Sequence, residues 1–242
     1  MRRILNASPR GALCALLLAA SLGCSTAAPQ TGRPAPTPAL SPTPTPSRAD
    51  DAGRPASEPY RGDLSIFEDP NRERNLQLDR VMDILGVREG SHVADIGAGS
   101  GWFTVRAARR VGPRGLVYAV EINPDYLKHI EERAAREKLP NVRPVLGKED
   151  DPLLPAGGLD AVLLLKTYHE VAQPIALLER VRHAMRPGAR LGIIDREGKG
   201  DDHGVARDSV TQEAARAGFK LLEQHDFVKP DGMDYFLVFQ PN

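Results

Sequence analysis

The chain has 242 residues, and its 32 Lys and Arg residues balance its 32 Asp and Glu residues, so the formal charge is zero. This length predicts one folded domain with additional segments. The balanced charge gives no indication of nucleic acid or of an anionic surface as a partner.

The first residues have the pattern of an export signal. Arg2, Arg3 and Arg10 precede an apolar run that ends in Leu22-Gly23-Cys24. The run is too short for a membrane-spanning helix of about 20 residues. The segment resembles the signal peptide and lipobox of bacterial lipoproteins. That resemblance implies removal of residues 1–23 and a lipid anchor on Cys24, at the periplasmic face of the envelope.

Two alternatives to the lipoprotein signal remain, because Ser21 stands where a lipobox usually has leucine. They are a plain secretory signal and an uncleaved anchor; a misassigned start would instead make the protein cytoplasmic. Cys14 and Cys24 are the two cysteines of the chain. Cleavage before Cys24 would therefore leave one lipid-bound cysteine and no disulfide.

A linker follows the signal. Residues 25–59 are rich in Pro, Thr, Ser and Ala and have almost no large apolar side chains, so they cannot bury a core. Such segments act as extended spacers. The predicted organisation is a signal peptide over residues 1–23, a lipidated cysteine with a disordered linker over 24–59, and a folded domain over 60–242.

The folded domain begins with a predicted helix over Asp69–Leu85, capped by Asp69 with Pro70 in the first turn. Strands are predicted over 92–96, 116–122, 142–146 and 159–165, and helices over 102–111, 123–138 and 174–186.

The most informative stretch is residues 93–104, VADIGAGSGWFT. It predicts a strand, a tight turn with three glycines, and a helix whose first amides face the turn. The dinucleotide pattern G-x-G-x-x-G/A is not met, because the bulky Trp102 stands where a small residue is required. Asp95 and the spacing of the glycines resemble motif I of class I S-adenosylmethionine-dependent methyltransferases. A purely structural turn is the alternative.

The resemblance continues along the chain. Glu121 closes the second strand, where the family has an acidic residue that accepts hydrogen bonds from the ribose hydroxyls. An acidic residue after the third strand often receives the adenine amino group, and Asp150 is preferred over Asp151 for that role. The cofactor-binding residues that the resemblance implies are Asp95, Gly97, Ala98, Gly99, Gly101, Glu121, Ile122, Asp150, Asp151 and Lys166.

A polar cluster, KTYHE, follows the nearly all-apolar fourth strand. Its Tyr168-His169-Glu170 resembles a stretch of the methyltransferase branch that acts on small molecules and quinones. The catalytic candidates are Tyr168, His169 and His203, the histidines as proton acceptors and the tyrosine beside the sulfonium. Helix capping or burial of His169, and a surface position of His203, are the alternatives. A metal site is not expected, because adjacent side chains point apart and no third ligand is evident.

The last third of the chain is predicted to complete the sheet. "MRPGARLGIID" resembles the family's turn and fifth strand, whose terminal Asp195 either faces the substrate or caps the turn. Ser209 and Gln212 predict a capping box for a helix that runs to Ala217. A hairpin about residues 230–232 follows. The fold implied is a Rossmann-like, seven-stranded, mostly parallel sheet with helices on both faces and a C-terminal antiparallel hairpin.

The expected function is methyl transfer from S-adenosylmethionine to a small-molecule acceptor, with no nucleic acid as partner and with membrane association through Cys24. The sequence does not predict an oligomeric state. S-adenosylmethionine is made in the cytoplasm, so an exported enzyme conflicts with the location of its cofactor. The alternative is an inactive binding module of the same fold at the envelope.

Overall fold

The computed structural model describes residues 56–199 and 202–242. The predicted signal peptide, Cys24 and residues 24–55 of the predicted linker lie outside these residues. Within the described part of the chain, no helix combines the length and the apolar composition that crossing a bilayer requires.

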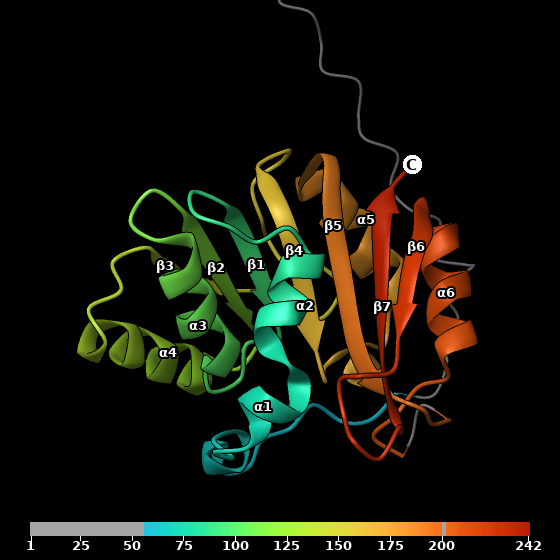
Figure 1. Ribbon diagram of the computed structural model, residues 1–242, viewed down its shortest axis with the longest axis horizontal. Coiled ribbons are helices and arrows are strands. Elements are labelled where there is room, and N and C mark those ends of the chain that lie inside the picture. Colours follow the sequence, from blue (N-terminus) through green and yellow to red (C-terminus); the bar gives the residue numbers. More distant parts are fainter. Residues whose placement is uncertain (1–55, 200–201) are drawn as a thin grey trace, which may run out of the picture. The chain divides into compact units, whose positions relative to one another are not determined.

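A seven-stranded sheet forms the centre of the domain, in the order β3-β2-β1-β4-β5-β7-β6 (Figure 1). The first five strands are parallel to one another, whereas β7 is antiparallel to both β5 and β6. This confirms the predicted fold class and the closing antiparallel pair. The strands are β1 (His92–Ile96), β2 (Leu116–Glu121), β3 (Val142–Leu146), β4 (Leu159–Leu165), β5 (Met185–Arg196), β6 (Phe219–His225) and β7 (Asp234–Pro241).

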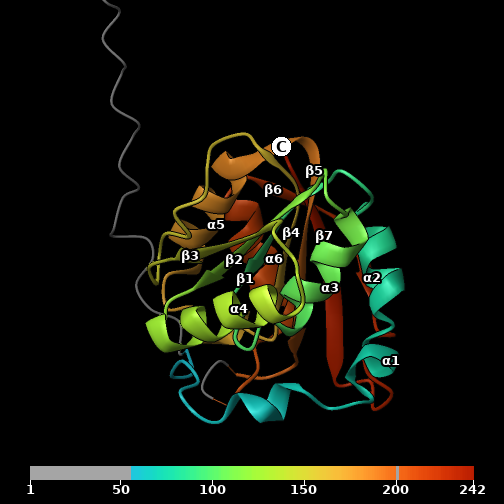
Figure 2. The same ribbon diagram turned by 90° about the vertical axis from the view of Figure 1, so that its left-hand side faces the viewer.

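Helices cover both faces of the sheet, as the turned view also shows (Figure 2). The side chains of α2, α3 and α4 join one buried apolar cluster with the sheet, and those of α5 and α6 join a second cluster on the opposite face. The helices are α1 (Arg72–Leu76), α2 (Leu78–Ile84), α3 (Trp102–Val111), α4 (Pro124–Arg136), α5 (Pro174–Ala184) and α6 (Arg207–Arg216), with 3-10 turns η1 (Leu64–Phe67) and η2 (Tyr168–Glu170).

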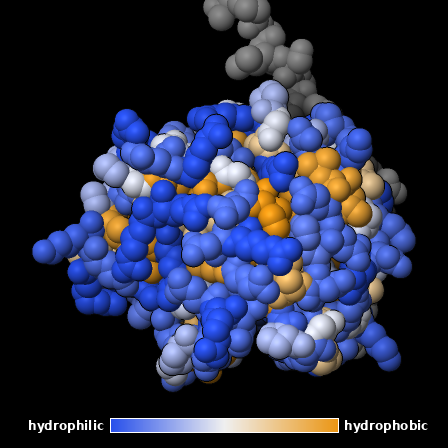
Figure 3. Space-filling model, in the orientation of Figure 1, coloured by the Kyte–Doolittle hydropathy of each residue, from blue (hydrophilic) through white to orange (hydrophobic). Residues whose placement is uncertain are grey.

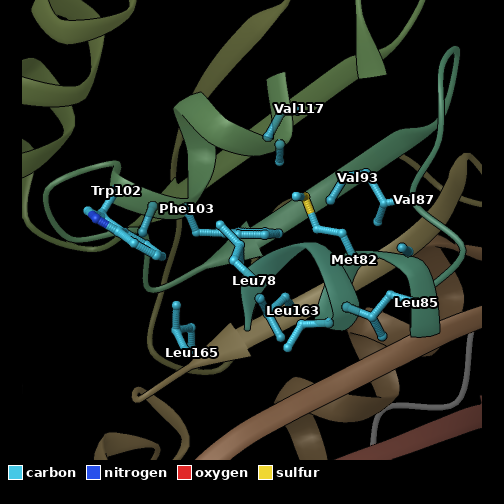
Figure 4. Close-up of a cluster of buried hydrophobic side chains, with 14 of the residues drawn as sticks. Leu78, Met82, Leu85, Val87, Val93, Trp102, Phe103, Val117, Leu163 and Leu165 are labelled. Atoms are coloured by element: carbon cyan, nitrogen blue, oxygen red, sulfur yellow. The ribbon is translucent and has the colours of Figure 1, made fainter. Parts of the chain in front are cut away.

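The first cluster packs α2 and α3 against the middle of the sheet (Figure 4). Met82 of α2 and Leu85, which directly follows that helix, lie there with Phe103 of α3 and Leu163 of β4, all of them buried. Strand β4 is apolar along most of its length because both of its faces are covered. The face seen in Figure 3 is mostly hydrophilic, with apolar residues in separate patches.

The helix predicted over Asp69–Leu85 is wrong in one respect, because it is two helices. Gln77 between them has a left-handed backbone, with φ of 48°. Leu76 and Leu78 are both buried, yet residues two apart lie about 200° apart around a continuous helix. The break at Gln77 lets both side chains face the core. Asp69 accepts a hydrogen bond from the Asn71 amide instead of capping a helix at Pro70.

The predicted capping box of the last helix is also wrong. Helix α6 begins at Arg207, two residues before Ser209, and no side chain of its N-cap residue Ala206 caps it. The Arg207 amide instead donates to the Glu197 carboxylate, 3.4 Å away. A carboxylate from a preceding loop thus serves the helix N-terminus, where negative charge is favourable.

Candidate functional site

A cavity of about 1250 Å³ lies at the carboxyl ends of β1, β2 and β4. Open α/β sheets bind their ligands at this edge. Typical small-molecule sites measure about 300–1,000 Å³, so this cavity has room for a nucleoside cofactor together with a small second ligand.

The glycine turn forms one wall of the cavity through Gly97, Ala98 and Gly99, whereas Gly101, also predicted to bind the cofactor, does not line it. Gly97, Gly99 and Gly101 have φ values of 72°, 54° and 73°, a left-handed backbone that favours glycine. A Cβ atom on Gly97 would lie 2.2 Å from Cγ2 of Thr167. The amides of Gly97 and Ala98 donate to the Val120 carbonyl, which fixes the turn to the end of β2.

Glu121 lies opposite this turn, and its carboxylate faces the glycine loop. Oε2 accepts the Gly99 amide at 2.9 Å, and Oε1 accepts the amides of Ile122 and Asn123 at 2.8 and 3.0 Å. Glu121 and Ile122 both line the cavity. The carboxylate is thus an oriented acceptor, held by backbone donors, of the kind that a pair of sugar hydroxyls requires.

Asp95 lies beneath the turn and is almost completely buried. Its Oδ2 accepts the Thr104 hydroxyl at 2.6 Å. Burial raises the pKa of the Asp95 carboxyl to about 7, while the Thr104 hydrogen bond and the nearby charge of Arg72 oppose that shift. Asp95 therefore supports the turn and also lines the cavity.

Arg72 is a site residue that the sequence analysis did not single out. Its guanidinium lies 4.5 Å from the centre of the Trp102 ring, donates to the Phe67 carbonyl at 2.9 Å and lines the cavity. Burial lowers the pKa of Arg72. Arg72 belongs to a run of charges, Arg72-Glu73-Arg74, which is typical of a solvated helix face. The sequence therefore gave no indication that Arg72 lines a cavity.

The acidic residues after β3 occupy different positions. Asp150 lines the cavity, as predicted for an adenine contact, whereas Asp151 does not and instead accepts the Leu153 amide at 2.9 Å. Asp150 is therefore the one of the two that lines the cavity, and its contact with adenine stays a prediction. Lys166 lines the cavity and forms an ion pair with the buried Asp234, with Nζ 2.5 Å from Oδ2.

The three catalytic candidates separate in the structure. Tyr168 is fully buried in the second apolar cluster, and its hydroxyl donates to Glu213 at 2.7 Å. It does not line the cavity, which corrects the expectation that it contacts the sulfonium. The chain turns sharply in η2, so Tyr168 and His169 point in different directions. His169 and His203 both line the cavity, with ring centres 6.0 Å apart.

Asp195 accompanies His169. Nδ1 of His169 lies 2.9 Å from Oδ1 of Asp195, and the His169 amide donates to Oδ2 at 3.0 Å. On the other side of the ring, Nε2 lies 3.9 Å from Oε1 of Glu170. Burial raises the pKa of the Glu170 carboxyl to about 7, against the opposing effect of His169. The sequence predicted that Asp195 either faces the substrate or caps the turn. Its contact with His169 is neither of these.

A segment that we call the N-terminal strap, residues 56–67, closes one side of the cavity and crosses the edge of the sheet at which the parallel strands end (Figures 1 and 2). Ser57 donates its amide to the His169 carbonyl at 3.0 Å, and its hydroxyl oxygen accepts the His203 amide at 3.1 Å. The Tyr60 amide donates to Glu170 at 3.3 Å. Residues 56–59, which the sequence analysis assigned to the linker, therefore belong to the site.

No group of three or more His, Cys, Asp or Glu side chains within residues 56–199 and 202–242 is arranged to hold a metal ion.

Comparisons with known proteins bear on this site. Residues 93–188 match a family model described as a methyltransferase domain. The chain is 32% identical over 114 residues to nocamycin O-methyltransferase of Saccharothrix syringae, covering 47% of this chain and 41% of that protein. It is 28% identical over 148 residues to a fibrillarin-like rRNA/tRNA 2'-O-methyltransferase of Pyrobaculum calidifontis, covering 59% and 62%. The chain thus spans about 40 to 60% of the length of these curated relatives.

Among solved structures, the fold is similar to that of a SAM-dependent methyltransferase from Aquifex aeolicus, with a TM-score of 0.67 and 23% identity over 75% of this chain and 100% of that one. The domain has a Rossmann-like methyltransferase fold. The match to the methyltransferase-domain model lies within this fold and includes the glycine turn and Glu121.

Proposed function

We propose that the protein transfers the methyl group of S-adenosylmethionine to a small-molecule acceptor bound in the same cavity. The observation that carries the proposal is the Glu121 carboxylate, which lines the cavity beside the glycine turn and accepts the Gly99 amide of that turn. A nucleoside presents hydroxyl donors to a carboxylate acceptor, and the turn gives its backbone close approach to the ligand.

The residues present fit this cofactor. Glu121 is oriented for the sugar hydroxyls, and Asp150 lines the cavity for the base. Asp95 joins the end of β1 to Thr104 in α3, the helix that follows the turn. The sulfonium supplies an activated methyl group when it is bound. The chain's own task is then to align the acceptor with that methyl group and to exclude water, and alignment alone can supply a large part of the rate enhancement.

His169 and His203 are the proposed proton acceptors for an acceptor molecule that carries an ionisable proton. Both line the cavity beside the N-terminal strap. The strap encloses this side of the cavity, which favours a small molecule over a macromolecule. The balanced charge of the chain agrees with that preference. By their names, one curated relative is a nocamycin O-methyltransferase and another is an rRNA/tRNA 2'-O-methyltransferase, so the preference rests on the enclosed cavity and the charge balance.

Calorimetric titration of the full chain with S-adenosylmethionine tests the proposal. We expect saturable binding of S-adenosylmethionine to one site. NAD is the control nucleotide and should give no heat of binding, because Trp102 replaces the small residue that a dinucleotide requires. Absence of binding at millimolar S-adenosylmethionine would leave the alternative, a binding module of the same fold without cofactor.

We further propose that the chain is exported and lipid-anchored through Cys24, with cleavage after residue 23. The lipobox-like Leu22-Gly23-Cys24 and the Pro/Thr-rich linker support this. Mass spectrometry of the mature amino terminus from membranes, compared with a Cys24→Ala variant, tests it. A lipid-modified Cys24 is the expected result, and an intact Met1 in the soluble fraction would refute it.

A further inference from the structure

Asp195 and His169 form a buried pair, and only His169 has a role in the proposed function. Asp195 is fully buried near the end of β5, and His169 is 6% exposed in η2 after β4. The two residues are joined by the side-chain contact from Nδ1 and by a backbone hydrogen bond from the His169 amide. This double attachment fixes the ring relative to the end of the sheet.

The Asp195 carboxylate is itself held in place. Oδ1 accepts the Arg196 amide at 2.8 Å and Oδ2 accepts the His169 amide at 3.0 Å. An ionised carboxylate only accepts hydrogen bonds, whereas a neutral imidazole donates from one nitrogen and accepts at the other. A neutral imidazole can donate to this carboxylate only from a protonated Nδ1, and that tautomer leaves the lone pair on Nε2.

Nε2 is free to act in the cavity. It lies 3.9 Å from the nearer Glu170 oxygen, beyond hydrogen-bond distance, and the His169 ring lines the cavity beside His203. Ser57 of the strap holds the His169 carbonyl from the opposite side. The backbone of His169 is thus tied on both sides, and the ring, with Nε2 on the side of Glu170, belongs to the wall of the cavity.

We propose that Asp195 is a positioning residue that holds His169 in the Nδ1–H tautomer, so that Nε2 is the proton acceptor of the reaction. The inference rests on the proposed function for its catalytic meaning. The acceptor's O–H proton passes to Nε2 as the acceptor oxygen forms its bond to the methyl carbon. The carbon–sulfur bond breaks with its electrons remaining on sulfur, which becomes a neutral thioether, and the resulting imidazolium is stabilised by the Asp195 carboxylate.

Nitrogen-15 NMR of the full chain, labelled at its six histidines, tests the tautomer directly. Spectra are recorded well above the ordinary histidine pKa of about 6.5, and a His169→Gln variant identifies the His169 signals. In the wild type we expect one dominant tautomer with the proton on Nδ1. In Asp195→Asn we expect that dominance to be lost, because the two backbone amides compete for the single remaining oxygen and the amide NH₂ cannot accept. An equivalent aspartate-to-asparagine change in a serine protease puts its histidine in the wrong tautomer.

Asp160→Asn is the matched control. Asp160 is also a strand carboxylate that accepts a histidine amide, that of His92 at 2.8 Å, but it does not line the cavity. Its replacement should leave the His169 signals unchanged. A wild-type spectrum with the proton on Nε2 would overturn the proposal without any variant, and so would a folded Asp195→Asn protein whose tautomer is unchanged.

Titration of the same samples with S-adenosylmethionine separates this inference from the proposed function. Cofactor binding with the proton on Nε2 would refute the role of Asp195 and leave the function standing. An Nδ1–H tautomer without cofactor binding would refute the function and leave the pair as a structural arrangement.

Discussion

Replacement of Gly97 by alanine tests whether the glycine turn is required by close packing or by backbone conformation alone. Gly97 and Gly86 have the same φ of 72°, but they differ in surroundings. A Cβ atom on Gly97 would lie 2.2 Å from Cγ2 of Thr167, whereas a Cβ on Gly86, after α2, would meet nothing within 4 Å. Gly86→Ala therefore measures the backbone strain by itself.

The two effects have different expected sizes. A left-handed residue with a side chain costs about 1–2 kcal/mol, so Gly86→Ala should lower the free energy of unfolding by that amount. Gly97→Ala adds an overpacking term of about 1–3 kcal/mol. Real Cβ atoms essentially never show a separation of 2.2 Å, so the turn or the Thr167 side chain must move by more than about 1 Å to reach ordinary contact.

Urea unfolding of both full-length variants gives the free energies, and calorimetry gives their affinities for S-adenosylmethionine. We expect Gly97→Ala to be the less stable variant and to lose about tenfold in affinity, or about 1.4 kcal/mol, with the affinity of Gly86→Ala unchanged. Equal losses of stability in the two variants, or an unchanged affinity in Gly97→Ala, would show that Thr167 does not constrain the turn.

Three further predictions concern single side chains. Glu121→Gln removes the charged acceptor and should weaken S-adenosylmethionine binding about 10- to 100-fold. This corresponds to the loss of a hydrogen bond to a charged group, about 1.5–3 kcal/mol. Glu132→Gln, on the exposed side of α4, is the control and should bind as the wild type does. Because the pKa of Asp95 is raised, the folded protein binds more protons than the unfolded chain between about pH 4 and 7. The contribution of this group to the free energy of unfolding, on the order of 4 kcal/mol, is therefore lost as the pH rises through that range. Asp95→Asn should flatten the fall in unfolding free energy over the same range, and an unchanged slope would count against burial as the cause. Tyr168→Phe should cost about 1 kcal/mol of stability, through its lost hydrogen bond, with cofactor affinity unchanged.

The parts of the fold that follow from local pattern could be predicted from the sequence. The glycine spacing after a short apolar strand fixed the position of the turn, and the acidic end of β2 placed Glu121 across from it, because parallel strands bring their carboxyl ends to one edge. The break at Gln77 could not be predicted in the same way. The break depends on which side chains pack against the sheet. The sequences before and after Gln77 both have helical periodicity, so the pattern predicts one continuous helix.

The acceptor side of the site was less predictable because its contacts join residues far apart in the chain. Tyr168, His169 and Glu170 are adjacent in sequence, but the tight turn of η2 sends the tyrosine into the core and the other two toward the cavity. The Asp195–His169 contact spans 26 positions. No spacing rule links two residues that meet only because β4 and β5 are neighbours in the sheet.

The N-terminal strap also determines how the protein should be shortened for study. A fragment that begins at residue 60, the boundary that composition alone would select, lacks Ser57 and the hydrogen bonds that it makes with the backbones of His169 and His203. In such a fragment the cavity would be open on the side that the N-terminal strap closes. Weak ligand binding by the fragment would then result from the missing part of the strap. A truncated version that keeps the whole chamber begins no later than Ala56.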